Sequence, residues 1–416
     1  MRAVLLRRAI PSLALAGLLA ACSSGDSSNG PPSVLGAVSV SSGAYGSCAV
    51  GGAGGLVCWG ALPTGTPSDT ALVGADALGA VAISTPIDLI AIALSREALS
   101  GGNSGCMVGS DHSTYCWGYL FDSDISVDLG PGIHALAGAT SANSVAIGDR
   151  SVICVTRTDR AVRCFGAFEG GGRGTDSVDV SDAGPDFSLT ATGLSPAQAA
   201  FGTALGFQSG CAIRTDSLVA CWGTRHRGQL GGAVADSTQD CGAASPPWCQ
   251  RGPAVVAGGR KYRQVSAQVD HVCATLISGG VECWGRKFGA AVGGWSTTCT
   301  TASDCVNTPT AVTLPAAAVR VMVGSEHACA LLSTGEVYCW GDNTYGQLGR
   351  AGAASATPVK VSGGFSFSTL SAGEFHTCAV EVGSGAIGCW GRNEAGQLGD
   401  GTTTDRDHPV AVVLAQ

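Results

Sequence analysis

Cysteine is the residue type whose number and spacing could support the most chemistry in this sequence. The 416 residues contain 19 cysteines, and fourteen of them form couples, six spaced ten residues apart and the seventh eleven apart. Such couples could close disulfides or supply zinc ligands. No C-x-x-C occurs, and no ten-residue couple has a second couple nearby to complete four ligands, so the spacing favours disulfides. The expected pairs are Cys48 with Cys58, Cys106 with Cys116, Cys154 with Cys164, Cys211 with Cys221, Cys273 with Cys283, Cys329 with Cys339, and Cys378 with Cys389.

The five remaining cysteines form two shorter couples and leave one residue over. We expect Cys241 to pair with Cys249, and Cys299 with Cys305. Cys22 ends the sequence "LAAC", which resembles the lipobox of bacterial lipoproteins, where the cysteine carries the acyl chains and becomes the first mature residue. The alternative is an ordinary signal cleaved nearby, with Cys22 left as a stray thiol.

The N-terminal residues have the layout of a secretory signal. Three arginines precede an apolar run that is too short to span a membrane. A stretch rich in Ser, Gly and Pro follows and predicts a flexible tether. The predicted organisation is a lipoprotein signal peptide at 1–21, a tether at 22–34 and a folded domain at 35–416. We expect an exported protein that is lipid-anchored in the bacterial envelope, at the outer membrane.

Composition and charge narrow the class of partner. With 63 glycines, 45% hydrophobic and 13% charged residues, the chain suits short strands joined by tight turns rather than a disordered polyelectrolyte. The formal net charge is −8, and it becomes about −11 once the three arginines of the signal are removed. An acidic chain without a basic run argues against nucleic acid or an anionic lipid surface as partner.

The cysteine couples require β-hairpins to position them. Between Cys329 and Cys339 the turn sequence "STGE" lies between the apolar runs "CALL" and "VYCW". A hairpin centred on Thr334 sets the two cysteines directly opposite each other, with Leu331 facing Val337. Opposed residues at a non-hydrogen-bonded site lie about 4.5 Å apart at Cα, within disulfide range.

The hairpins recur seven times, at intervals between first cysteines of 48 to 62 residues. A repeat of this length cannot bury its own apolar faces and must stack on its neighbours. The fuller copies show four short strand-like runs each, which predicts an all-β, seven-bladed β-propeller of four-stranded antiparallel blades. The run "HPVAVVL", residues 408–414, resembles the strand before each hairpin, so we expect this C-terminal strand to complete the N-terminal blade and close the ring.

Three stretches resemble the repeats of the regulator of chromosome condensation superfamily. They read "GSEHACALLSTGEVYCWGDNTYGQLG", "AGEFHTCAVEVGSGAIGCWGRNEAGQLGDGT" and "CWGTRHRGQLG". The resemblance extends over 35–416 but is uneven, because the first three copies and the fifth lack "GQLG", and Phe165 replaces Trp in the third. It implies a seven-bladed propeller; relatives with this fold include guanine-nucleotide exchange factors and secreted β-lactamase inhibitors.

Most of the conspicuous residues fit structural roles. A tryptophan in "CWG" recurs at one blade position, where its face would fill the gap between blades. His271, His327 and His376 each lie two residues before a hairpin cysteine, and a histidine repeated in one slot is more often packed and hydrogen-bonded than a ligand or base. The glycines of "GQLG" predict turn positions with positive φ. These tryptophans are Trp59, Trp117, Trp222, Trp284, Trp340 and Trp390.

Trp248 and Trp295 lie outside that slot and accompany the two short cysteine couples. Both segments precede the same kind of strand in successive copies, so they should emerge on one face, side by side. Disulfide-closed loops with exposed aromatic residues predict a partner-binding ridge, because less ordering entropy is lost on binding. The alternative is that each Trp packs within its own loop.

Signals for a metal or for catalysis are weak. Alternating acids at Asp122, Asp124 and Asp128, with Ser126, resemble a calcium loop but lack its glycine and its final glutamate. No catalytic motif occurs, and no cofactor is expected, although propellers can assemble carboxylates in a central funnel. We therefore expect a monomeric, protein-binding scaffold or inhibitor-like module for another envelope or extracellular protein. The alternatives are an envelope polysaccharide hydrolase or lyase and a structural or adhesive surface protein.

Overall fold

A computed structural model describes most of the folded domain. The described ranges are 36–61, 76–83, 85, 87–95, 104–117, 133–136, 138–148, 153–159, 162–165, 203–206, 209–224, 227–232, 249–287 and 305–414. They belong to one compact unit, residues 32–416. Within these ranges no helix has the length and apolar composition that crossing a bilayer requires. The predicted signal peptide and the predicted tether, including Cys22, lie outside the described residues.

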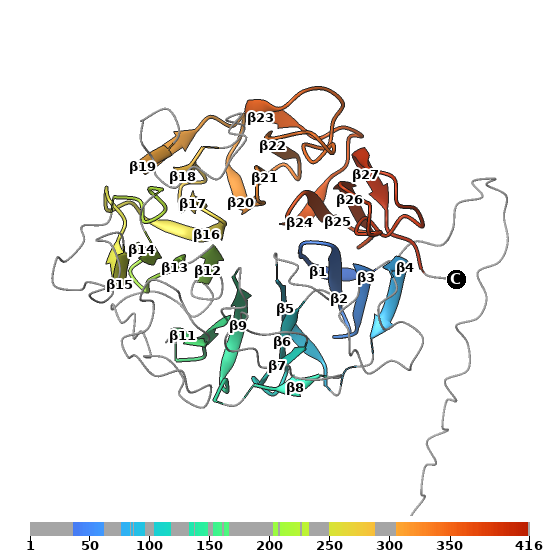
Figure 1. The fold of residues 1–416 in the computed structure, drawn as a ribbon, viewed down its shortest axis with the longest axis horizontal. Helices are drawn as coiled ribbons and strands as arrows, with labels where there is room; N and C mark the ends of the chain where they lie inside the picture. The colour runs from blue at the N-terminus through green and yellow to red at the C-terminus, as the bar shows by residue number, and fades with distance from the viewer. Residues whose placement is uncertain are drawn as a thin grey trace, which may run out of the picture. The chain divides into compact units, whose positions relative to one another are not determined.

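The described residues form seven antiparallel sheets, six with four strands and one with three. In each sheet the spatial order of the strands follows the chain, and the sheets are arranged around a ring (Figure 1). We call them blades one to seven. Blade one contains β1 (Ala37–Ser42), β2 (Gly46–Gly51), β3 (Leu56–Ala61) and β4 (Asp76–Ile83), and blade two contains β5 (Leu89–Leu94), β6 (Gly105–Gly109), β7 (Thr114–Trp117) and β8 (His134–Ala135). Blade three contains β9 (Ala142–Ile147), β10 (Ile153–Arg157) and β11 (Val162–Phe165), and blade four contains β12 (Thr203–Gly206), β13 (Ser209–Ile213), β14 (Val219–Thr224) and β15 (Cys249–Val255).

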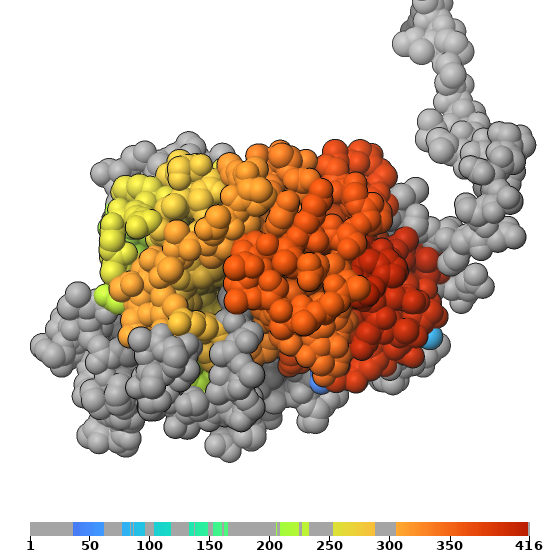
Figure 2. Space-filling view, turned by 90° about the horizontal axis from the view of Figure 1, so that it is seen from above, coloured from blue at the N-terminus to red at the C-terminus, as the bar shows by residue number. Residues whose placement is uncertain are grey.

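Blades five to seven are the most regular. They lie next to one another in the yellow, orange and red part of the surface (Figure 2). Blade five contains β16 (Tyr262–Gln268), β17 (His271–Leu276), β18 (Val281–Arg286) and β19 (Cys305–Val312), and blade six contains β20 (Ala318–Val323), β21 (His327–Leu332), β22 (Val337–Gly341) and β23 (Ser355–Lys360). Blade seven contains β24 (Phe367–Ala372), β25 (His376–Glu381), β26 (Ile387–Gly391) and β27 (Arg406–Ala411).

The first strand of each blade lines the centre of the ring. These seven strands contact one another in succession, and β24 of blade seven contacts β1 of blade one. The ring is therefore closed by packing between first strands. The predicted all-β, seven-bladed propeller is confirmed, with three strands rather than four in the described part of blade three.

The predicted mode of closure is wrong. The strand β27, at 406–411, pairs with β26 of its own blade, so that Cys389 lies opposite Val410. Blade one has its own fourth strand, β4, which pairs with β3 in the place predicted for the tail. After β27 the chain reaches blade one through a single parallel bridge between Ala80 and Leu414. In the six four-stranded blades the strand that follows the hairpin completes that hairpin's blade, because it folds back directly on the third strand.

The hairpin register matches the prediction. Cys329 lies opposite Cys339, and Leu331 lies opposite Val337. All seven hairpin couples are joined by disulfides, with Cα atoms 4.0 to 4.1 Å apart. The seventh hairpin absorbs its extra residue in the turn, since Cys378 still lies opposite Cys389. Each blade's second and third strands are thus clamped at mid-length.

Candidate functional site

The strand order places the loops of every blade on two opposite faces of the ring. The ends of the first and third strands and the starts of the second and fourth strands lie on one face, which we call the loop face. The turns between second and third strands, beside the disulfides, lie on the other, which we call the hairpin face. In blade six, residues 324–326 and 342–354 belong to the loop face, and Thr334 belongs to the hairpin face.

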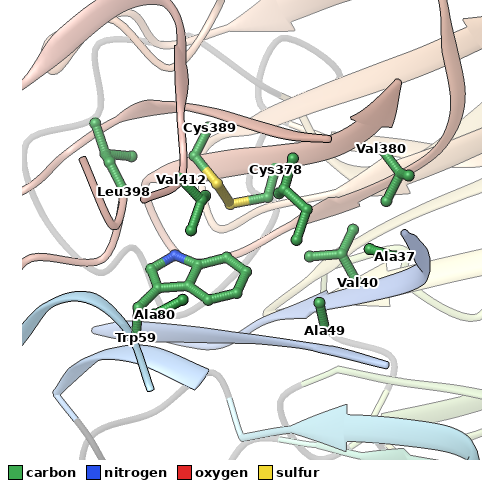
Figure 3. Packing of buried hydrophobic residues seen from close by; sticks show 11 residues of the cluster. Ala37, Val40, Ala49, Trp59, Ala80, Cys378, Val380, Cys389, Leu398 and Val412 are labelled. Atoms are coloured by element: carbon green, nitrogen blue, oxygen red, sulfur yellow. A yellow bond between two sulfur atoms is a disulfide. The ribbon is translucent and has the colours of Figure 1, made fainter. Parts of the chain in front are cut away.

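The "GQLG" segments of the loop face latch blades four, six and seven onto the blade that follows each of them. Leu398 of blade seven packs on Trp59 of blade one, together with Val412 (Figure 3). The indole nitrogen of Trp59 donates a hydrogen bond of 2.9 Å to the carbonyl of Gln397. Because the Trp belongs to the following blade, "GQLG" and "CWG" form one inter-blade contact. The same bond joins Trp284 to Gln229 and Trp390 to Gln347, each at 3.0 Å.

Blade one lacks "GQLG", so the tryptophan of blade two has no latch segment to bond to. Within the described residues the buried indole nitrogen of Trp117 has no hydrogen-bond partner. The ring of Trp117 is nevertheless buried, with 1% of its surface exposed, and it packs in one hydrophobic cluster with residues of blade one. The predicted role of the "CWG" tryptophans, filling the space between blades, is confirmed, and the latch bond is present in the three places where "GQLG" precedes them.

An asparagine organises the "GQLG" loops of blades six and seven. The side chain of Asn343 accepts the backbone N–H of Leu348 at 2.9 Å and donates to the carbonyls of Arg350 and Gly352. Asn393 makes the equivalent bond to Leu398 at 2.9 Å in blade seven. These bonds fix the loop before any partner arrives. The glycines have the positive φ that the sequence predicts, for instance +83° and +68° at Gly346 and Gly349.

The three repeated histidines are fully buried and hydrogen-bonded, as their slot predicts. His327 contacts the hydroxyl of Thr377 at 2.9 Å, which joins blades six and seven. His376 contacts the hydroxyl of Ser47 at 2.8 Å, which joins blades seven and one. They hold neighbouring blades together and do not face a ligand site.

His271 in blade five is held neutral by its surroundings. Burial, and then the positive charge of Arg286, lower its pKa from 6.5 to about 3. Its Nδ1 lies 2.5 Å from the carbonyl of Arg286. The ring therefore remains uncharged across the physiological pH range.

Ion pairs cross the blade boundaries on the loop face. Arg227 of blade four pairs with Asp270 of blade five, and Arg286 of blade five pairs with Glu326 of blade six. Burial raises the pKa of Glu326 in spite of its partner Arg286. In each pair the acid is the residue directly before the repeated histidine of its blade, and the arginine belongs to the preceding blade.

An aromatic cluster replaces the ion pairs where blades six, seven and one meet. The guanidinium carbon of Arg392 lies 5.0 Å from the ring centre of Tyr345, 5.6 Å from that of Phe375 and 5.7 Å from that of Tyr45. Tyr345 and Phe375 also contact each other, with ring centres 5.5 Å apart. Glu394 pairs with Arg392 from the solvent side. All four members of this Arg392 cluster are partly exposed, so a rigid cationic and aromatic surface spans three blades.

A groove adjoins the cluster and shares Tyr345 with it. The groove has a volume of about 470 Å³ and lies between the blade-six loop at 343–352 and the residues 405–408 that lead into β27. Arg350, Asp405 and His408 are among its lining residues. Cluster and groove form a continuous polar and aromatic stretch of the loop face, which we take as the candidate functional site.

The central channel has a different character. Its cavity, of about 440 Å³, is lined by all seven first strands with mainly small, hydroxyl and aliphatic side chains, among them Ser41, Ile92 and Ser266. Arg320 and Gln264 also line it, and the described lining residues include no Asp or Glu. Within the described ranges no group of His, Cys, Asp or Glu is arranged to hold a metal.

Several predicted residues lie outside the described ranges. They include Trp248, Trp295 and the acid-rich loop at 122–128, so neither the aromatic ridge nor the calcium hypothesis is tested. Cys249 begins β15, and Cys305 begins β19 and is disulfide-bonded. Cys241 and Cys299, their predicted partners, also lie outside. The flanking strand ends lie on the loop face, because each segment joins a third strand to a fourth.

The sequence alone did not identify the Arg392 cluster. Its members occupy the variable positions of the repeat: Arg392 follows "WG", Tyr345 precedes "GQLG", and Phe375 precedes the repeated histidine. Tyr45 is the blade-one equivalent of Phe375. Aligning the copies and comparing their variable positions is the signal that could have found them.

Comparison with known proteins identifies the repeats. The fold and the latches define a disulfide-stapled β-propeller made of sevenfold repeats. A family model described as the regulator of chromosome condensation (RCC1) repeat matches residues 319–347, and a second model with the same description matches 334–380 and 384–416. Residues 319–380 and 384–416 are therefore similar to RCC1-type repeats, and human HERC2 is a further relative in sequence.

The chain is similar to a curated protein in sequence and to solved structures in fold. The chain is 28% identical over 169 residues to the human E3 ubiquitin-protein ligase HERC2, a match that covers 40% of this chain and 3% of HERC2. The crystal structure of human WBSCR16 has a TM-score of 0.65 at 18% identity, covering 86% of this chain and 93% of that one. Prp20p from Saccharomyces cerevisiae has a TM-score of 0.47 at 15% identity, covering 90% and 76%.

Proposed function

We propose that this chain is an exported, lipid-anchored protein-binding module that captures another envelope or extracellular protein on its loop face. RCC1-like propellers commonly mediate protein interactions, and the yeast protein Prp20p has binding properties to Gsp1p and histones. An exported chain would meet neither, so the partner proposed here is of a different kind. The N-terminal sequence pattern and the seven disulfides support the exported compartment.

The Arg392 cluster is the observation that carries the proposal. Tyr, Trp and Arg dominate binding hot spots because they combine a large contact area with polar tips. Here an arginine stacks against three aromatic rings from blades six, seven and one, including Tyr345 and Phe375. The stacking and the bonds of Asn343 fix these side chains, so little ordering entropy remains to be lost on binding.

The test compares partner capture from envelope extract by matched variants. The purified chain, Arg392→Ala and Tyr345→Ala are used as bait, and captured proteins are identified by mass spectrometry. Truncating a hot-spot residue costs at least about 2 kcal/mol, roughly 30-fold in affinity. We therefore expect both variants to lose the same specific partner.

The control lies on the hairpin face of the same blade. Lys360 pairs there with Glu336 and is half-exposed, so Lys360→Ala removes a surface charge without touching the loop face. Thermal unfolding of every variant checks that the fold persists. The proposal is contradicted if Lys360→Ala loses the partner while the folded Arg392→Ala variant retains it.

A further inference from the structure

The groove beside Tyr345 holds several charged groups, and nearly all of them are satisfied internally. Arg406 pairs with Asp400 at 2.8 Å. Asp407 and His408 are 2.8 Å apart. The carboxylate of Asp405 accepts the backbone N–H of Asn393 at 2.7 Å.

Arg350 is the exception in this groove. Its buried Nε finds no acceptor, and within the described residues its guanidinium has no hydrogen bond or ion pair. Seven other arginines also have a buried Nε without an acceptor, but each places another guanidinium nitrogen on a carboxylate or a carbonyl. They are Arg157, Arg163, Arg214, Arg227, Arg263, Arg286 and Arg392.

The backbone that presents Arg350 is fixed on both sides. The amide of Asn343 donates to the carbonyls of Arg350 and Gly352, at 3.0 and 2.7 Å. Gly346, on the same loop, lies so close to blade seven that an added Cβ would come within 2.6 Å of the carbonyl of Arg406. The guanidinium therefore lies at a preformed position where two blades meet.

We propose that Arg350 is the recognition site for a carboxylate side chain, Asp or Glu, of the partner polypeptide. An arginine remains charged at any physiological pH and cannot relieve its desolvation by losing a proton. The Nε is buried, so a partner carboxylate reaches the guanidinium through its two Nη atoms, in a bidentate pair of charge-assisted hydrogen bonds. Each of the other charged lining residues has a contact within the described part of the chain. Arg350 is therefore the charged group of the groove that a partner can satisfy.

This inference deepens the proposed function and rests on it. Tyr345 belongs to both the groove and the Arg392 cluster, so a partner bound to the cluster passes over Arg350. The partner surface would carry an acidic residue beside the group that contacts the aromatic rings. The net charge of −8 gives no general attraction to acidic peptides, so binding of such a peptide would have to come from a local site.

The experiment measures the fluorescence anisotropy of two labelled peptides, Gly-Ser-Glu-Glu-Ser-Gly and its Gln-Gln analogue, with the full chain at low ionic strength. Charge-assisted hydrogen bonds predict a preference of roughly tenfold or more for the glutamate peptide. In Arg350→Gln the preference should disappear, and in Arg350→Lys it should fall, because a lysine cannot bind a carboxylate in a bidentate pair. Arg157→Gln, in blade three and paired with Asp159 in the native chain, should retain it.

A second measurement follows the reaction of arginines with phenylglyoxal. The glutamate peptide should protect Arg350 from modification, and the glutamine peptide should not. Equal affinity for the two peptides overturns the inference, as does a preference that survives in a folded Arg350→Gln variant. Protection by inorganic phosphate without protection by the peptide overturns the assignment to a polypeptide. Partner capture that depends on Arg392 but not on Arg350 leaves the proposed function standing and removes this inference alone.

Discussion

The latch between blades seven and one makes a sharp prediction about one glycine. Gly399, the last residue of "GQLG" in blade seven, has φ of +64°. A Cβ added there would lie 2.7 Å from Cδ1 and 2.8 Å from Cγ of Trp59. The substitution Gly399→Ala must therefore displace the indole and weaken its hydrogen bond to Gln397.

A second glycine separates backbone strain from loss of the latch. Gly401 also has positive φ, +81°, but a Cβ there would come no closer than 3.8 Å to Val413. Left-handed backbone costs an L-residue about 1 to 2 kcal/mol in either place. Overpacking adds about 1 to 3 kcal/mol and a weakened hydrogen bond about 1 kcal/mol at Gly399 alone. We expect Gly399→Ala to be the less stable variant by about 2 to 4 kcal/mol.

Equilibrium unfolding in guanidinium chloride without reductant, followed by tryptophan fluorescence, measures the difference. Unchanged denaturant slopes would show that both variants unfold to the same extent. Equal destabilisation of Gly399→Ala and Gly401→Ala would refute the reasoning, because strain alone would then explain both. A shift of Trp59 fluorescence in the native state of Gly399→Ala alone would support it.

Three further predictions concern pH, the staples and the segments outside the described ranges. Because folding lowers the pKa of His271 from 6.5 to about 3, its contribution to stability is present above pH 6.5 and is lost as the pH falls toward 3. The loss amounts to about 2 to 3 kcal/mol between pH 7 and 4.5. Urea unfolding at both pH values should show a smaller loss in His271→Asn than in the parent. Replacing Cys329 and Cys339 together by serine opens a loop with a separation of ten residues and should cost about 3 kcal/mol in a thermal unfolding assay; no change would mean that the bridge adds nothing to folding. If the predicted aromatic ridge binds the partner, Trp248→Ala with Trp295→Ala should abolish partner capture without lowering the melting temperature, and unchanged capture would reject the ridge.

The repeat spacing predicted the propeller because the constraint that fixes each hairpin, the length of its turn, lies within a few residues of sequence. A turn of known length between Cys329 and Cys339 fixes the hairpin register, and a repeat that cannot bury its own faces implies a ring or an array. The closure was mispredicted because the sequence of the 408–414 strand does not tell whether it pairs with the hairpin before it or with another blade. Pairing with β26 is the shorter connection, and it is the one that forms.

The alternation of apolar and polar residues along the sequence did not reveal the bulges in the first strands. Val38 falls where the pairing of β1 with β2 skips a residue, and its side chain is 60% exposed. Val319 occupies the same position in β20 and is 40% exposed. A strict inside–outside alternation assumes an unbroken register, so a single skipped residue turns an aliphatic side chain outward.

The candidate site was missed for a different reason. Repetition identifies residues that do the same structural task in each blade, such as the tryptophans and histidines. A binding site on one side of a ring must depend on what differs between copies. Arg392 and Tyr345 are variable positions, and only the ring brings them beside Tyr45 from the other end of the chain.

Photo-crosslinking from two threonines of blade six tests the central claim most directly. Thr344 lies on the loop face beside Tyr345, and Thr334 lies on the hairpin face; both are exposed. A photoreactive phenylalanine derivative is placed at one position or the other, and the chain is irradiated in envelope extract. We predict a specific adduct with one protein from position 344 and none from position 334. An adduct from position 334 alone would contradict a partner-binding loop face.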